Sequence, residues 1–183
     1  MYFEGDVRTL TPIPEQLIAP IKNQLLNHDD LWRKLDPFKP NRFKVFSGNT
    51  HHIIFQYPRN RDDHRDTIYF PIWKSWQALL NPIIDYIAQH YGYAKGKTSR
   101  IMLARLLAGQ QCRPHIDHTP SADVPHKIHV PIQTHPDILF FEENRKYHLE
   151  YGHAYEVNNK IRHYAVNSSR IDRVHLIFDY YAT

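Results

Sequence analysis

Apolar residues recur at intervals of three and four in two stretches of the first half of the chain. In residues 13–28 these positions are Leu17, Ile18, Ile21, Leu25 and Leu26. In residues 73–87 they are Trp73, Trp76, Leu79, Leu80, Ile83, Ile84 and Ile87. This spacing predicts two amphipathic helices, with the tryptophans in the core. Pro20 and Pro82 predict a shifted start or a kink in each helix, and Gly92 and Gly96 predict the end of the second.

Short apolar segments separated by polar or proline-containing turns replace the helical pattern after residue 98. They predict strands at about 99–107, 127–132, 137–142, 146–151, 153–157 and 171–181. Upstream, residues 43–56 predict two short strands around a turn at 47–49, followed by a polar loop at 57–67. Two helices followed by at least six strands predict a mainly β fold, with two sheets and helices packed on one side.

The length of 183 residues favours one domain. We expect residues 1–183 to form it, with a helical and strand-containing part at 1–98 and a β core at 99–183. The chain contains no run of eighteen apolar residues, and its start, MYFEGDVRTL, lacks the apolar centre of a signal peptide. One cysteine, Cys112, excludes an internal disulfide framework. We therefore expect a cytoplasmic protein with no membrane partner.

The formal net charge is +4, with 23 Lys and Arg against 19 Asp and Glu. These residues are scattered rather than gathered in a basic tract, which argues against nucleic acid as a partner. A small anionic ligand explains the same charge. The arginines of the 57–67 loop could recognise an acidic substrate, but an exposed, solvated loop is the favoured interpretation.

The pattern His-x-Asp occurs four times, so context must separate a metal site from coincidence. Three of the pairs lie at a helix end, in the charged 57–67 loop and around a turn proline; they begin at His28, His64 and His135. The fourth, His115 and Asp117, follows an apolar strand. If residues 115–117 are extended, both side chains point to the same face.

A third ligand and an anion site follow downstream of this pair. His163 precedes Arg173 by ten residues, and two histidines with one carboxylate form the facial triad of non-haem Fe(II) oxygenases. Zinc is an alternative, because histidine and aspartate also bind it. Arg173 begins an apolar strand and shares its inward face with Asp179, so it requires an anion: either a ligand carboxylate or an acid such as Asp179.

The segments PHID, KIHVPIQT, YGHAYEVNN, His163, VNSS and RVHLIFD occur in an order that resembles the aspartyl/asparaginyl β-hydroxylase family, over roughly residues 99–181. These are 2-oxoglutarate-dependent oxygenases with a double-stranded β-helix (jelly-roll, cupin-like) core. The resemblance implies that His115, Asp117 and His163 bind Fe(II). The presence of the carboxylate ligand makes the chain more similar to bacterial members than to the animal peptidyl-aspartate enzymes.

The resemblance also implies how 2-oxoglutarate is held. Arg173 matches the arginine at its distal carboxylate, and Lys127 and His129 match two positions near its other end. Lys127 is a departure, because the family commonly has arginine there. His118 and Thr119, directly after the triad pair, are candidate substrate contacts.

We therefore expect a dioxygenase that uses Fe(II), 2-oxoglutarate and O₂ to hydroxylate an amino acid, free or within a peptide. Two alternatives remain at this point. One is a cupin-like metal dioxygenase that uses no keto-acid, against which Arg173 argues. The other is a non-enzymatic β-sandwich module that binds an anionic ligand.

Overall fold

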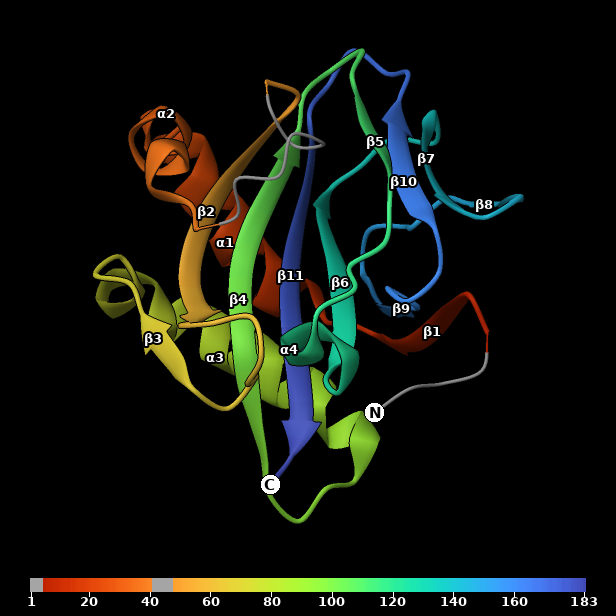
Figure 1. The fold of residues 1–183 in the computed structure, drawn as a ribbon. Coiled ribbons are helices and arrows are strands. Elements are labelled where there is room, and N and C mark those ends of the chain that lie inside the picture. Colours follow the sequence, from red (N-terminus) through yellow and green to blue (C-terminus); the bar gives the residue numbers. More distant parts are fainter. Residues whose placement is uncertain (1–4, 41–47) are drawn as a thin grey trace.

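The structure, a computed structural model, describes residues 5–40 and 48–183 as two antiparallel β-sheets with helices on the outside (Figure 1). The major sheet has the strand order β1 (Val7–Pro12), β9 (His153–Val157), β6 (His126–Gln133), β11 (Arg173–Ala182), β4 (Gly96–Leu106), β2 (Thr50–Pro58) and β3 (Thr67–Tyr69). The minor sheet has the order β5 (Gln111–His115), β10 (His163–Asn167), β7 (Ile138–Glu142) and β8 (Arg145–Tyr147). The predicted mainly β, jelly-roll-like class is confirmed.

The two predicted helices are α1 (Glu15–Asn27) and α3 (Trp73–Ala88), and both pack against one face of the major sheet (Figure 1). Shorter helices are α2 (Asp30–Leu35) and α4 (Pro120–Asp123), with 3₁₀ turns at Asp36–Phe38 and Gln89–Tyr91. Pro20 and Pro82 lie inside α1 and α3 without ending them. Both prolines are exposed, so water can satisfy the carbonyls that they leave unpaired.

Alternation along β11 divides its side chains between the two faces of the major sheet. Val174, Leu176 and Phe178 are buried in the core beneath the helices. Trp76 joins this core and meets the ring of Phe55 at 5.4 Å, which confirms the predicted packing of α3 on the sheet. The opposite faces of β11 and its neighbours turn toward the minor sheet. The residues expected from the sequence to form the site line a cavity there.

Several expectations differ from the structure at the edges of the sheets. The sequence pattern did not predict β5, β10, β1, β3 or α2, and the strand expected at 146–151 ends at Tyr147. Strand β5 is at the edge of the minor sheet and contains Pro114, and such strands carry few apolar residues. The second of the two strands expected within 43–56 is β2, which continues past residue 56 to Pro58; the first lies outside the described residues. No helix in the described ranges is long and apolar enough to cross a membrane.

Candidate functional site

Two histidines of the minor sheet face each other where their strands pair. His115 ends β5 and His163 begins β10; the two are register partners, with rings 4.4 Å apart. Asp117 follows two residues later, and its backbone N–H donates to the carbonyl of Asn159 at 3.1 Å. One ligand atom from each of His115, Asp117 and His163 lies within 4.8 Å of the others. The three residues expected to form the triad are therefore brought together.

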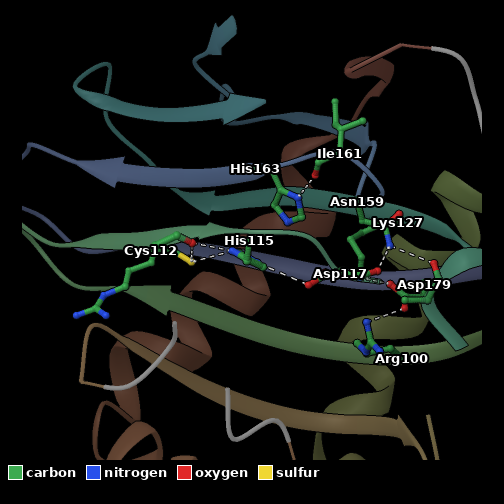
Figure 2. Close-up of polar contacts among 11 residues, drawn as sticks. Arg100, Cys112, His115, Asp117, Lys127, Asn159, Ile161, His163 and Asp179 are labelled. Carbon is green, nitrogen blue, oxygen red and sulfur yellow. Dashed lines mark hydrogen bonds and ion pairs between the residues drawn. The ribbon is translucent and has the colours of Figure 1, made fainter. Parts of the chain in front are cut away.

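Backbone carbonyls orient both imidazoles. The Nδ1 of His115 lies 2.8 Å from the carbonyl oxygen of Arg113, and the Nδ1 of His163 lies 2.9 Å from that of Ile161 (Figure 2). Because a carbonyl oxygen can only accept, each Nδ1 carries the proton and donates it. Each Nε2 then carries no proton and can act as an acceptor, which is the arrangement that metal-binding histidines need. The Nε2 of His115 lies 3.6 Å from Asp117 Oδ1.

The protonation states of the ligands also suit a metal ion. Burial alone would raise the pKa of Asp117, but the positive charge of Lys127, with contributions from His163 and His115, outweighs burial and lowers that pKa. Burial lowers the pKa of His163. Aspartate is therefore ionised and His163 neutral at physiological pH, so few protons compete with a cation. A set of two nitrogens and one carboxylate oxygen, with other positions open, fits Fe(II).

Arg173 lies on the wall of the same cavity, at the start of β11. Its side chain is 8% exposed; among the described residues its Nε finds no hydrogen-bond partner, and no acidic residue there forms an ion pair with it. Burial lowers its pKa to about 10, so the guanidinium stays charged at neutral pH. Asp179, the competing partner considered from sequence, does not fill this role, because it pairs with Arg100 and Lys127 instead.

Lys127 and His129 share one face of β6, as their alternation predicts, and both line the cavity. Lys127 Nζ lies 2.9 Å from Asp179 Oδ1 and 3.6 Å from Asp117 Oδ2 (Figure 2). Burial, followed by the charges of Arg173 and Lys127, lowers the pKa of His129 far below its usual value. His129 is therefore a neutral hydrogen-bonding group between two cationic side chains.

The cavity between the sheets has a volume of about 650 Å³. All eight residues singled out from the sequence line it: His115, Asp117, His118, Thr119, Lys127, His129, His163 and Arg173. His118 stands at the rim, where its side chain is mostly exposed and lies 3.5 Å from Asp123. Thr119 precedes α4 and contacts Ser121.

Other cavity residues were missed from sequence, notably Arg100, Tyr57 and Cys112. Alternation along β4 places Arg100 on one face of the strand, but the pairing of β4 with β11, which sets it beside Asp179, is known only from the structure. No sequence signal marks Cys112, whose thiol lies buried 3.8 Å from His115 Nδ1.

The other His-x-Asp pairs do not form comparable groups. Within the described residues, His115, Asp117 and His163 are the one cluster of at least three potential ligands. His135 and Asp137 contact each other on an exposed turn, and His64 packs edge-on against the ring of Tyr181. In the 57–67 loop, Arg65 lies outside the cavity, whereas Arg59 and Arg61 line it, and the mostly exposed Arg59 pairs with Asp66.

The chain is similar to known proteins both in sequence and in fold. The family model described as aspartyl/asparaginyl beta-hydroxylase matches residues 72–183. No curated protein sequence matches the chain significantly. Among solved structures, an oxidoreductase of the 2OG-Fe(II) oxygenase family from Burkholderia pseudomallei has 14% identity and a TM-score of 0.63, covering 97% of this chain and 86% of its own.

Two prolyl hydroxylases share the fold as well. One, from Trichoplax adhaerens, was solved with a peptide fragment of the hypoxia-inducible factor oxygen degradation domain; it has 12% identity and a TM-score of 0.60, covering 97% of this chain and 84% of its own. A prolyl-4-hydroxylase from Pseudomonas putida has 12% identity and a TM-score of 0.56, covering 98% and 94%. The family match extends over more than half of the chain and includes all eight residues singled out from the sequence. The chain belongs to the aspartyl/asparaginyl beta-hydroxylase family.

Proposed function

We propose that the protein is an Fe(II)- and 2-oxoglutarate-dependent dioxygenase that hydroxylates an unactivated C–H bond of an amino acid, free or within a peptide. Residues 1–183 would act as one oxygenase domain, since strands from both halves of the chain share the major sheet. The free Cys112 is consistent with a reducing, cytoplasmic setting. Family membership supports the enzyme class, and the position of the predicted residues around one cavity supports the roles proposed below.

His115, Asp117 and His163 would hold the iron from one side. Their ligand atoms come from the paired ends of β5 and β10 and from the segment that follows β5, so the sheet fixes their spacing. Three protein ligands leave positions for a bidentate keto-acid and for O₂. Zinc would fit the same donors, but the anion site beside them favours iron with an oxo-acid.

The observation that carries the proposal is the buried guanidinium of Arg173 on the wall of the metal cavity, which no acid of the described chain neutralises. Burying such a charge is costly unless an anion accompanies it. A carboxylate offers two oxygens to the planar fork of arginine, and 2-oxoglutarate has one carboxylate free when the other chelates a metal. We assign its distal carboxylate to Arg173 and its other end to the neighbourhood of His129 and Lys127.

When bound, iron, 2-oxoglutarate and O₂ supply oxidative decarboxylation to succinate and CO₂, with transfer of one oxygen atom to the substrate. The protein residues perform the remaining tasks. The triad fixes the iron, Arg173 fixes the keto-acid, and the walls of the cavity limit access of water. His118 and Thr119, at the rim, are proposed to contact the substrate.

Two other functions make different predictions. A metal dioxygenase without a keto-acid would have no use for Arg173 and would consume O₂ without forming succinate. A non-enzymatic module would bind an anion but turn nothing over. The peptide in the Trichoplax enzyme motivates including peptides beside free amino acids in any screen.

The test is a screen of free L-amino acids and short peptides with Fe(II), 2-oxoglutarate and O₂. The proposal expects at least one compound to stimulate succinate formation and to gain one oxygen atom, measured by mass spectrometry. An enzyme with an intact metal site that converts no 2-oxoglutarate with any compound would contradict it.

A further inference from the structure

Three charged side chains form a row across three neighbouring strands of the major sheet, and the two cations among them line the cavity. They are Arg100 of β4, Asp179 of β11 and Lys127 of β6 (Figure 2). Asp179 pairs in register with both neighbours; its Oδ2 lies 3.0 Å from Arg100 Nη1 and its Oδ1 lies 2.9 Å from Lys127 Nζ. Asp179 is six residues from Arg173 on the same strand, which corresponds to about 20 Å of strand length.

The two cations of this row do not have the same acidic partners. Lys127 pairs with Asp179 at 2.9 Å and with Asp117 at 3.6 Å, whereas the ion pair of Arg100 is with Asp179. When a metal takes the charge of Asp117, one carboxylate, that of Asp179, remains for two buried cations, an excess of one positive charge. Such an excess is stabilised by an anion, and a ligand in the cavity can supply it.

Arg100 is the member of the row that is built to bind a ligand. Its side chain is 9% exposed, it lines the cavity, and its Nε has no hydrogen-bond partner within the described part of the chain. The guanidinium carbon of Arg100 lies over the ring of Tyr57, 4.8 Å from the ring centroid. Asp179 and Tyr57 thus hold the guanidinium in place while donor hydrogens remain for another acceptor.

We infer that Arg100 is a specificity-determining residue that binds a carboxylate of the substrate, an inference that rests on the proposed function. Arg100 is separated from Lys127 and the triad by one side chain, that of Asp179. A substrate whose carboxylate binds Arg100 therefore has its reacting carbon within a few bonds of that carboxylate. The substrate is then a small acid of amino-acid size. Its carboxylate belongs either to the α-carbon or to an acidic side chain, and Arg173 keeps the co-substrate.

Wild-type enzyme provides the first test. Succinate formation is measured with L-amino acids, with their α-carboxamides, and with the pairs aspartate and asparagine, and glutamate and glutamine. Capping the recognised carboxylate as an amide should raise KM at least tenfold, and the pair that responds identifies which carboxylate is bound. A best substrate whose amides react as well as the acid overturns the inference.

The second test uses Arg100→Gln, Arg100→Lys and, as a matched control, Arg65→Gln, an exposed loop arginine outside the cavity. Arg100→Gln should raise the Michaelis constant for the acid at least tenfold and leave that for the keto-acid within twofold. Arg100→Lys keeps the ion pair with Asp179 and should restore part of the loss. Anaerobic calorimetry, with N-oxalylglycine in place of 2-oxoglutarate, measures substrate affinity directly, without turnover. The affinity should fall in Arg100→Gln by the same factor as the Michaelis constant rises.

The outcomes separate this inference from the function on which it rests. Succinate formation with an unchanged substrate KM in Arg100→Gln refutes the role of Arg100 but leaves the oxygenase assignment intact. Absence of succinate with every compound refutes the oxygenase assignment, and the inference falls with it.

Discussion

Replacement of Arg173 by alanine should weaken the binding of 2-oxoglutarate without removing the metal. The guanidinium is buried on the cavity wall and has no protein anion among the described residues, so its hydrogen bonds to a ligand carboxylate form in a largely dehydrated place. Arginine cannot ligate iron, and the triad residues come from β5, the segment that follows it, and β10. Fe(II) affinity should therefore be unchanged in Arg173→Ala.

Arg173→Ala should lose about 1.5–3 kcal/mol of the free energy of 2-oxoglutarate binding, the range for a hydrogen bond to a charged group. This corresponds to a dissociation constant roughly ten to 150 times higher. Arg173→Lys should recover part of this, because an ammonium group retains the charge but not the planar fork. The effect on the stability of the ligand-free protein should be the opposite. Arg173→Met removes a buried charge that lacks a counter-ion, so the unfolding temperature of this variant should equal or exceed that of the wild type.

Anaerobic titration of the Fe(II)-loaded variants with 2-oxoglutarate, followed by calorimetry, measures these affinities. Thermal unfolding without ligand checks the stability prediction. Wild-type affinity in Arg173→Ala would show that the anion binds elsewhere, with Lys127 as the next residue to test, and would remove the main argument for a keto-acid.

The remaining predictions concern the metal, one buried acid and the core. His115→Ala should abolish specific Fe(II) binding in equilibrium dialysis, whereas His135→Ala should bind iron as the wild type does; equal binding by both variants would contradict the assigned triad. Burial, aided by the charge of Asp6, raises the pKa of Glu142 from 4.5 to about 8. Between these two pH values the folded state holds the proton and the unfolded state has lost it, so the free energy of unfolding should fall as pH rises from about 4.5 to 8. In Glu142→Gln, denaturation measured across that range should not show this fall. Leu176→Ala should cost about 2–5 kcal/mol in urea unfolding, because it leaves a cavity under the helices, whereas the exposed Leu26→Ala should change little.

Patterns repeated along an element made much of the fold predictable. The spacing of Trp76, Leu80 and Ile83 identified α3, and alternation along β11 assigned its faces correctly. Strands β5 and β10 were missed because they are short, carry polar ligand residues and lie in a sheet of only modest apolar content. Side-chain pattern alone does not distinguish such strands from loops.

The site was predictable as a set of residues but not as a network. The order of His115, Asp117, His163 and Arg173 along the chain was informative, because histidine and aspartate are ligands for a metal and arginine is suited to a carboxylate. The partners of Asp179 were not predictable, since they depend on which strands are neighbours in the sheet. That pairing placed Asp179 between Arg100 and Lys127, and Arg173 forms no ion pair with an acid of the described chain.

The central claim is that the cavity holds Fe(II) and 2-oxoglutarate together, on the triad and Arg173. Its most direct test is the visible charge-transfer absorption that arises when a keto-acid chelates Fe(II), recorded anaerobically in the wild type and in His163→Ala. The account predicts that the band appears in the wild type on addition of both components and is absent from the folded variant. A wild type that binds Fe(II) but develops no band, or a variant that develops it fully, would contradict the account.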